Sequence, residues 1–244
     1  MSIAVLIVLI GFINFASAFI QASCGFGYAM VAMSLMPLLM SMRQCASISA
    51  ITVVVIAVQM CMTLGKHLVL RKVCIPVISC MMTIPVGMYF LMHFDEILLR
   101  RILASAIILL TLFFLYTRKR NIRITGTWYQ GLAAGLITGI STGMFNIVGP
   151  FFMVYYVSIM DDMLSFKASM EFSFLIAGLY SVVMHTVQGN ITGEMLPYYA
   201  VSAVGACIAG RLGLYVFKKI NKEKMTLIVY FLLPVLALML LLNS

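Results

Sequence analysis

Ten long apolar segments divide this sequence, and they constrain the fold more than any other feature. They lie at about residues 2–22, 26–41, 45–64, 73–92, 101–117, 128–142, 147–160, 168–187, 195–216 and 225–242. A membrane-spanning helix needs about 20 predominantly apolar residues, and most of the segments approach that length. Apolar residues make up 64% of the chain and charged residues only 9%. The sequence therefore predicts an all-α integral membrane protein, a polytopic helical bundle, and excludes a soluble globular enzyme or a disordered chain.

Two short breaks interrupt the apolar pattern of the sequence. The first, Ser23–Gly27, separates the segments at 2–22 and 26–41, and the second, Gly143–Asn146, separates those at 128–142 and 147–160. Glycine frees the backbone and allows close approach. Non-helical backbone at membrane depth is tolerated only where protein or a water-filled cavity surrounds it. We therefore expect two broken helix pairs that face the protein interior.

The chain also has an internal repeat with a period of about 122 residues. Residues that match at this offset are Gly27 with Gly149, Ala46-Ser47 with Ala168-Ser169, Gly87 with Gly210, and Phe94 with Phe217. The breaks, helices and loops also follow in the same order in both halves. The predicted organisation is a first membrane repeat at 1–117, a linker loop at 118–127 and a second membrane repeat at 128–244. Each repeat would contain a broken helix pair followed by three transmembrane helices.

Charge predicts the orientation of the two repeats. Lys and Arg gather in the loops at 66–72, 118–123 and 218–224, whereas the loops at 93–100 and 188–194 have little excess positive charge. The positive-inside rule places the three basic loops in the cytoplasm and both termini outside it. Since 66–72 and its repeat partner 188–194 then lie on opposite sides, the two repeats are predicted to be inverted. Basic loops also account for the net charge of +9 without a nucleic-acid partner.

Inverted repeats with broken helices are typical of secondary transporters, whose substrate site lies between the repeats. A helix that begins at a break presents free N–H groups and a partial positive charge, which suit an anion. The candidate substrate-binding residues are those around the two breaks: Gln21, Ser23, Cys24, Gly25, Gly27, Ser141, Thr142, Gly143, Asn146, Gly149 and Pro150. The alternative is that the glycines only allow helices to pack closely.

Glu171 is the candidate coupling residue. It lies about one turn into the segment at 168–187, with Lys167 four residues before it on the same helical face. A carboxylate at this position would relay protons or face the substrate path. The alternative is a salt bridge with Lys167 at the cytoplasmic interface.

Three stretches carry a resemblance to a known family. Gln21-Ala-Ser-Cys-Gly25-Phe26-Gly27-Tyr-Ala-Met-Val-Ala with Pro37, Gly139-Ile-Ser-Thr-Gly143-Met-Phe-Asn146-Ile-Val-Gly149-Pro150, and Val204-Gly205-Ala-Cys-Ile-Ala-Gly210-Arg211-Leu resemble motifs of the TauE/SafE family of sulfite and organosulfonate exporters. The resemblance covers nearly the whole chain. It implies export of a small anion such as sulfite or an organosulfonate across the cell membrane. We expect no cofactor.

Two other function classes stay open. Met30, Met33, Met36 and Met40 follow helical spacing, and thioether ligands suit Cu(I) in a soft-metal permease, although such a stripe also packs well in a membrane protein. A non-transporting scaffold or assembly protein is the other. No metalloprotease, nucleophile-elbow or phosphate-loop motif occurs, so we expect no enzyme and no resident metal. Candidate partners are a small anion, the lipid bilayer, protons as coupling ion and a second copy in a homodimer.

Overall fold

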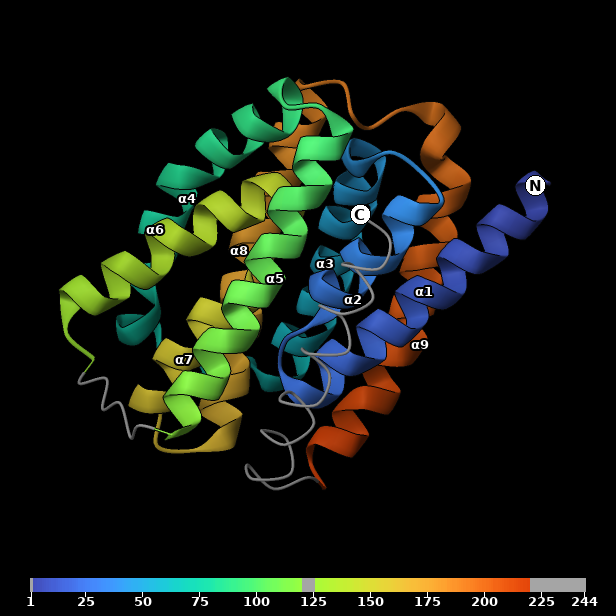
Figure 1. Ribbon diagram of the computed structural model, residues 1–244. Coiled ribbons are helices and arrows are strands. Elements are labelled where there is room, and N and C mark those ends of the chain that lie inside the picture. Colours follow the sequence, from blue (N-terminus) through green and yellow to red (C-terminus); the bar gives the residue numbers. More distant parts are fainter. Residues whose placement is uncertain (1, 120–125, 220–244) are drawn as a thin grey trace.

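The computed structural model describes residues 2–119 and 126–219 (Figure 1). These residues form helices and connecting turns, without a strand among them. The α-helices are α1 (Ile3–Cys24), α2 (Tyr28–Leu35), α3 (Met42–Leu64), α4 (Leu70–His93), α5 (Glu96–Lys119), α6 (Trp128–Phe145), α7 (Gly149–Ile159), α8 (Met163–Val187) and α9 (Leu196–Phe217). The predicted all-α fold is confirmed. The apolar segment at 225–242, and the parts of the predicted loops at 120–125 and 220–224, lie outside the described residues.

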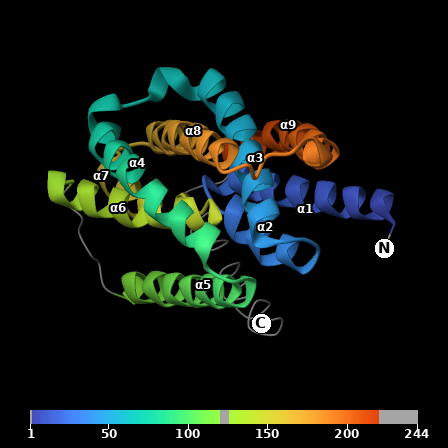
Figure 2. The same ribbon diagram turned by 90° about the horizontal axis from the view of Figure 1, so that it is seen from above.

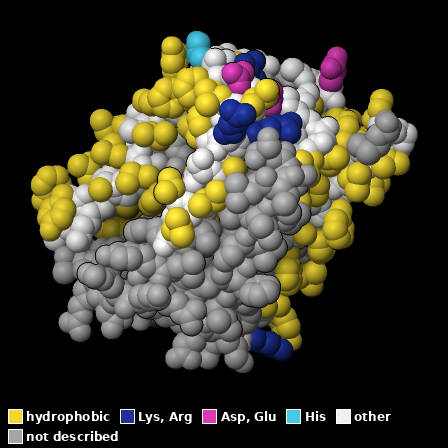
Figure 3. All heavy atoms as spheres, in the orientation of Figure 1, with side chains coloured by type: hydrophobic (Ala, Val, Ile, Leu, Met, Phe, Trp, Pro, Cys, Tyr) yellow, Lys and Arg dark blue, Asp and Glu magenta, His cyan; other side chains and the backbone are white. Residues whose placement is uncertain are grey.

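Long apolar helices make the chain a multi-pass membrane protein. Within the described residues, five helices are long and apolar enough to cross a bilayer, namely α1, α3, α4, α8 and α9 with their adjoining turns. Apolar side chains cover much of the described surface between the two ends of the molecule, and charged side chains gather at the ends (Figure 3). α2 and α7 are apolar but too short to span.

Both predicted breaks are present, and each has a local backbone cause. α1 is followed by Gly25, whose φ is 90°, and α2 is preceded by Gly27, whose φ is 109°. Residues with a side chain rarely adopt these values, so this turn depends on glycine. At the second break α6 ends at Asn146, whose φ is 55°. Asparagine tolerates this left-handed conformation better than most residues.

Small residues bring two pairs of long helices close together. α4 packs along α6, and α1 packs along α9. A Cβ atom on Gly135, Gly139 or Gly143 of α6 would lie 2.2 Å from a backbone oxygen of α4. On α9, a Cβ on Gly213 would lie 2.4 Å from the Cβ of Ala22. Close helix packing through small residues is the usual arrangement in membranes.

Matching the helices by the repeat period relates one of these two helix pairs to the other. α1 then corresponds to α6 and α4 to α9, so that α4 against α6 in one half mirrors α9 against α1 in the other. α3 and α8, which also correspond, pack against each other. This pattern fits two related halves. The division into inverted repeats at 1–117 and 128–244 stays a prediction.

The loops gather at two ends of the bundle (Figure 1). At the end we call the basic end, Lys72 donates a hydrogen bond to the carbonyl of Ile159, and Lys218 and Lys219 follow α9. At the opposite end, Asn190 donates to Met92 Sδ at 3.4 Å, and Arg43 donates to the Met92 carbonyl at 2.9 Å. The loops at 66–72 and 188–194 therefore lie at opposite ends of the molecule.

α5 lies apart from the other helices when the bundle is seen from above (Figure 2). An apolar groove of about 340 Å³ separates it from α6 and α7, with Ile102 and Leu109 on one wall and Ile140 and Phe151 on the other. The groove extends to Phe145 and Ile147 at the second break.

Candidate functional site

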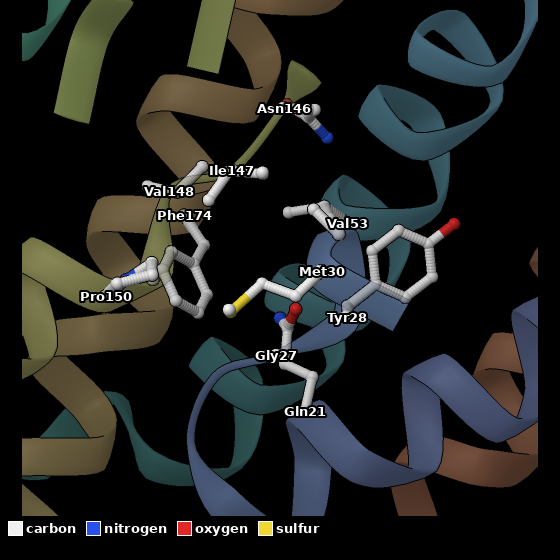
Figure 4. Close-up of a pocket in the computed structure, with 12 residues that line it drawn as sticks. Gln21, Gly27, Tyr28, Met30, Val53, Asn146, Ile147, Val148, Pro150 and Phe174 are labelled. Atoms are coloured by element: carbon white, nitrogen blue, oxygen red, sulfur yellow. The ribbon is translucent and has the colours of Figure 1, made fainter. Parts of the chain in front are cut away.

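The two breaks meet at one small cavity in the protein interior (Figure 4). Gln21 and Asn146 lie at its opposite ends, and Val53 and Phe174 reach it from α3 and α8. Its full lining is Gln21, Gly27, Tyr28, Ala29, Met30, Val53, Asn146, Ile147, Val148, Gly149, Pro150 and Phe174. The cavity measures about 10 Å³, which is near the lower limit for one water molecule. Residues more than 100 positions apart in the sequence therefore share one site.

The breaks also touch each other directly. A Cβ atom on Gly149 would lie 2.7 Å from the Cβ of Phe26, a distance that packed side chains do not adopt. Phe26 stands between Gly25 and Gly27 and is buried. Glycine at 149 thus lets the start of α7 approach the first break, as expected for a position where backbone must come close to another group.

The cavity is lined by the first turns of both half-helices. Tyr28, Ala29 and Met30 form the first turn of α2, and Gly149 and Pro150 form the start of α7. No side chain caps either helix start. The first N–H groups of a helix have no partner within the helix and carry partial positive charge. Pro150 has no N–H, so it loses nothing at this position.

Asn146 supplies an uncommitted polar group to the cavity. Its side chain is 1% exposed, and within the described part of the chain neither its amide nitrogen nor its amide oxygen has a hydrogen-bond partner. Buried polar groups are nearly always paired. An unpaired amide is therefore unusual, and this one lies beside two helix starts, where it would meet any group that entered the cavity.

A buried ion pair adjoins the opposite end of the cavity. Lys167 Nζ lies 2.7 Å from Glu171 Oε1, and neither side chain has exposed surface. Lys167 also donates to the carbonyl oxygen of Gln21 at 2.8 Å, and Gln21 Nε2 donates to Glu171 Oε2 at 3.4 Å. The salt bridge expected between these residues is therefore present, but it is enclosed by protein rather than set at an interface.

Several predicted residues of the first break surround this pair. The N–H of Gly25 donates to the same Gln21 carbonyl at 2.8 Å. Gly25 also lies beside the Lys167 side chain, because a Cβ atom added to this glycine would be 3.8 Å from Lys167 Cδ. Ser23 and Cys24 are buried in the same turn, and Ser23 Oγ has no partner. Neither Ser23 nor Cys24 lines the cavity.

Three predicted residues of the second break lie outside the cavity. Thr142 donates to the Thr138 carbonyl at 2.7 Å and Ser141 to the Ile137 carbonyl at 3.1 Å, so both hydroxyls are used within α6. Ser141 lines the groove beside α5. A Cβ on Gly143 would lie 2.2 Å from the Ile84 carbonyl oxygen. For Gly143 the structure thus favours the helix-packing alternative.

Three residues that were not predicted from the sequence, Phe26, Val53 and Phe174, shape the cavity or the contact between the breaks. They are apolar residues in apolar segments, so hydropathy carries no signal for them. Phe174 follows Glu171 by three residues, and helical spacing from that carboxylate would have pointed to it.

The methionine stripe belongs to the core. Met30, Met33 and Met36 are at most 1% exposed, and Met40 is half-buried. The sulfur of Met33 accepts a hydrogen bond from Ser49, and that of Met36 accepts one from Asn14. These contacts favour packing over metal binding. In the part of the chain that the structure describes, no three His, Cys, Asp or Glu side chains form a group suited to a metal ion.

Comparison with known proteins gives one match. A family model described as "Sulfite exporter TauE/SafE" matches residues 7–240, nearly the whole chain. No curated protein and no solved structure matches.

Proposed function

This chain belongs to the TauE/SafE sulfite exporter family, and from that premise we propose that it is a secondary transporter of a small sulfur oxyanion or organosulfonate. The family implies a membrane transporter that exports sulfite or a related anion. The finer parts of the proposal are the cytoplasmic membrane as location, termini outside the cytoplasm, inverted repeats, and an anion held where the two helix breaks meet.

One observation carries the proposal. Two uncapped helix starts and the unpartnered amide of Asn146 face the same buried cavity. Backbone N–H groups at helix starts and an amide N–H are donors, and together they match the oxygens of a sulfite or sulfonate group. Donors without formal charge bind such an anion while leaving the empty cavity free of an isolated ion.

The cavity is too small for the anion, so transport requires the cavity to widen. A space of about 10 Å³ admits one water molecule but no sulfur oxyanion. We infer that α2 and α7 separate when the anion enters, and that the contact between Gly149 and Phe26 opens in that step. Access from one side of the membrane and then the other follows when the halves move against each other.

Reconstitution into proteoliposomes tests the function. We expect the purified protein to transport one or more of sulfite, sulfate and methanesulfonate, and to melt at a higher temperature in the anion that it transports. Gly149→Leu should abolish both effects, whereas Gly193→Leu, at a position with nothing within 4 Å of an added Cβ, should retain them. Folded protein that neither transports nor responds to any anion would overturn the proposal. A response to Cu(I) alone would favour the soft-metal permease.

A further inference from the structure

Lys167 and Glu171 form a charged pair with no exposed surface, beside a cavity suited to an anion. We propose that Lys167 is the positive charge that pairs with the anion during transport, and that Glu171 releases Lys167 by taking up a proton. This inference rests on the proposed function, because it assigns a coupling step to the same anion pathway.

Among the described residues, Glu171 has fewer contacts than Lys167. Lys167 Nζ forms a salt bridge with Glu171 Oε1 at 2.7 Å. Oε2 accepts a long hydrogen bond of 3.4 Å from Gln21. Lys167 by contrast also donates to the Gln21 carbonyl at 2.8 Å and lies 5.3 Å from the centre of the Phe217 ring. A buried carboxylate needs several good donors to stay charged at low cost, and this one has few.

The pair lies between the basic end and the cavity. Asp162 caps the start of α8 at the basic end, accepting hydrogen bonds from Ser165 and Leu164 that lower the pKa of its carboxyl group. At a rise of about 1.5 Å per residue, Lys167 follows within roughly two turns, then Glu171, and then Phe174, which lines the cavity. An anion that passes between the cavity and the basic end along α8 therefore meets Lys167.

Charge balance makes the exchange depend on a proton. The incoming anion and the Glu171 carboxylate compete for one ammonium group, and two anions beside one buried cation repel strongly where screening is weak. When a proton from water binds to a carboxylate oxygen of Glu171, the side chain becomes a neutral acid. Lys167 then pairs with the anion, so the protein takes up one proton for each anion that it binds at this position.

Two other titratable groups of the described residues interact with the pair. Cys24 of α1 interacts electrostatically with Lys167, and Cys61 of α3 interacts with Glu171. α9 contributes the uncharged ring of Phe217. The other titratable groups that face α8 are placed away from the pair: His67 near Asp162, Lys72 near Asp161, and Tyr156 of α7 on Ser173. Among these groups, Glu171 is therefore the one that loses the fewest other interactions when it exchanges a proton.

The other half of the chain indicates that the fold does not need a charged pair here. At the repeat period of about 122 residues, Lys167 and Glu171 correspond to Cys45 and Ser49 of α3. Both are fully buried and uncharged, and Ser49 donates to Met33 Sδ at 3.5 Å. Replacing a buried ion pair by neutral residues is often neutral for stability. A charged pair retained in only one half therefore suits a function better than a packing role.

The first test is the pH dependence of anion binding by the purified, full-length wild-type protein. Methanesulfonate is the probe, because its own charge stays constant across this range. Between about pH 6 and about pH 8 we expect its affinity to rise about tenfold for each pH unit lowered, since one proton is taken up with one anion. Calorimetry in buffers of different ionisation enthalpy should report the same uptake. Binding without a pH slope and without proton uptake would overturn the proposal.

Variants separate the coupling role from a structural one. Glu171→Gln should remove the pH slope. Lys167→Met combined with Glu171→Gln avoids an isolated buried charge, and we expect it to fold and to bind methanesulfonate roughly 10- to 100-fold more weakly. Lys72→Met with Asp161→Asn removes the exposed pair as the matched control, and should keep both the affinity and the slope.

The outcomes distinguish this inference from the proposed function. If the Lys167→Met, Glu171→Gln double variant binds as tightly as the wild type, Lys167 is not the counter-charge and the inference fails while the transport proposal stands. If the folded wild-type protein binds none of sulfite, sulfate and methanesulfonate, both fail.

Discussion

The two breaks share a position in their halves but differ in how their backbone turns. The first contains two glycines at positive φ, Gly25 at 90° and Gly27 at 109°, on either side of a buried Phe26. The second turns through Asn146 alone, at a φ of 55°, before Ile147 and Val148 lead into α7. The first turn depends on glycine, because residues with a side chain rarely adopt these φ values, whereas the second turn also places a polar side chain at the cavity.

The breaks differ even more in their polar partners. Gln21, just before the first break, contacts both Lys167 and Glu171. The side-chain amide of Asn146 at the second break has no hydrogen-bond partner among the described residues. The first break thus adjoins a charged pair on α8, and the second carries an amide without a hydrogen-bond partner among the described residues. We infer that the first break serves coupling, and the second serves recognition of the anion.

The largest expected effect is a difference in thiol labelling from outside the cell, which tests whether the two halves have opposite orientations. In a background without the six cysteines, Gln188→Cys should react with an impermeant thiol reagent in intact cells. Arg71→Cys, in the corresponding loop of the first half, should react only after the membrane is permeabilised, because basic loops stay in the cytoplasm. Labelling of both positions from the same side would break the comparison of inverted halves.

A substitution that disrupts the contact between the breaks should weaken anion binding. Gly149→Leu places a Cβ where Phe26 Cβ would be only 2.7 Å away, so the start of α7 must move away from the first break. We expect anion binding to weaken by at least about 100-fold, the loss of several polar contacts of roughly 1–3 kcal/mol each. Anion-dependent melting measures it, with Gly193→Leu as control. Wild-type affinity in a folded Gly149→Leu protein would show that the site lies elsewhere.

The first break should be sensitive to its backbone conformation. Gly27→Ala forces alanine to adopt a φ of 109°, which we expect to lower the free energy of unfolding by about 1–2 kcal/mol. Gly193→Ala lies in open space and should change it little. Thermal melting in detergent compares the two variants. Equal stability of both would mean that the turn relaxes to another conformation and does not depend on glycine.

The second break allows its backbone and side-chain roles to be separated. Asn146→Gly keeps a residue that adopts a φ of 55° without strain, so we expect the melting temperature without anion to stay near that of the wild type. The missing amide should weaken anion binding by about 1 kcal/mol, or about fivefold. Calorimetry on the two proteins measures the difference. Unchanged affinity would remove Asn146 from the site.

Local sequence features determined most of the elements and the positions of the breaks. The apolar segments predicted at 45–64, 73–92 and 168–187 correspond to α3, α4 and α8 within a few residues. Hydropathy and glycine act within a few positions along the chain, so a linear sequence displays them. The motifs around Gly27 and Gly149 also indicated the family, which the match over residues 7–240 confirms.

Tertiary structure decided which residues of those motifs meet. It directs Asn146 and Gly149 to the cavity, while it turns Ser141 toward the α5 groove and packs Gly143 against α4. It also encloses Lys167 and Glu171 beside Gln21, almost 150 positions away in the sequence. The physical reason is that these helices are apolar on nearly every face, so composition does not indicate which face meets lipid and which meets protein. Close contacts between specific side chains and backbone atoms make that choice, and they exist only once the helices are packed.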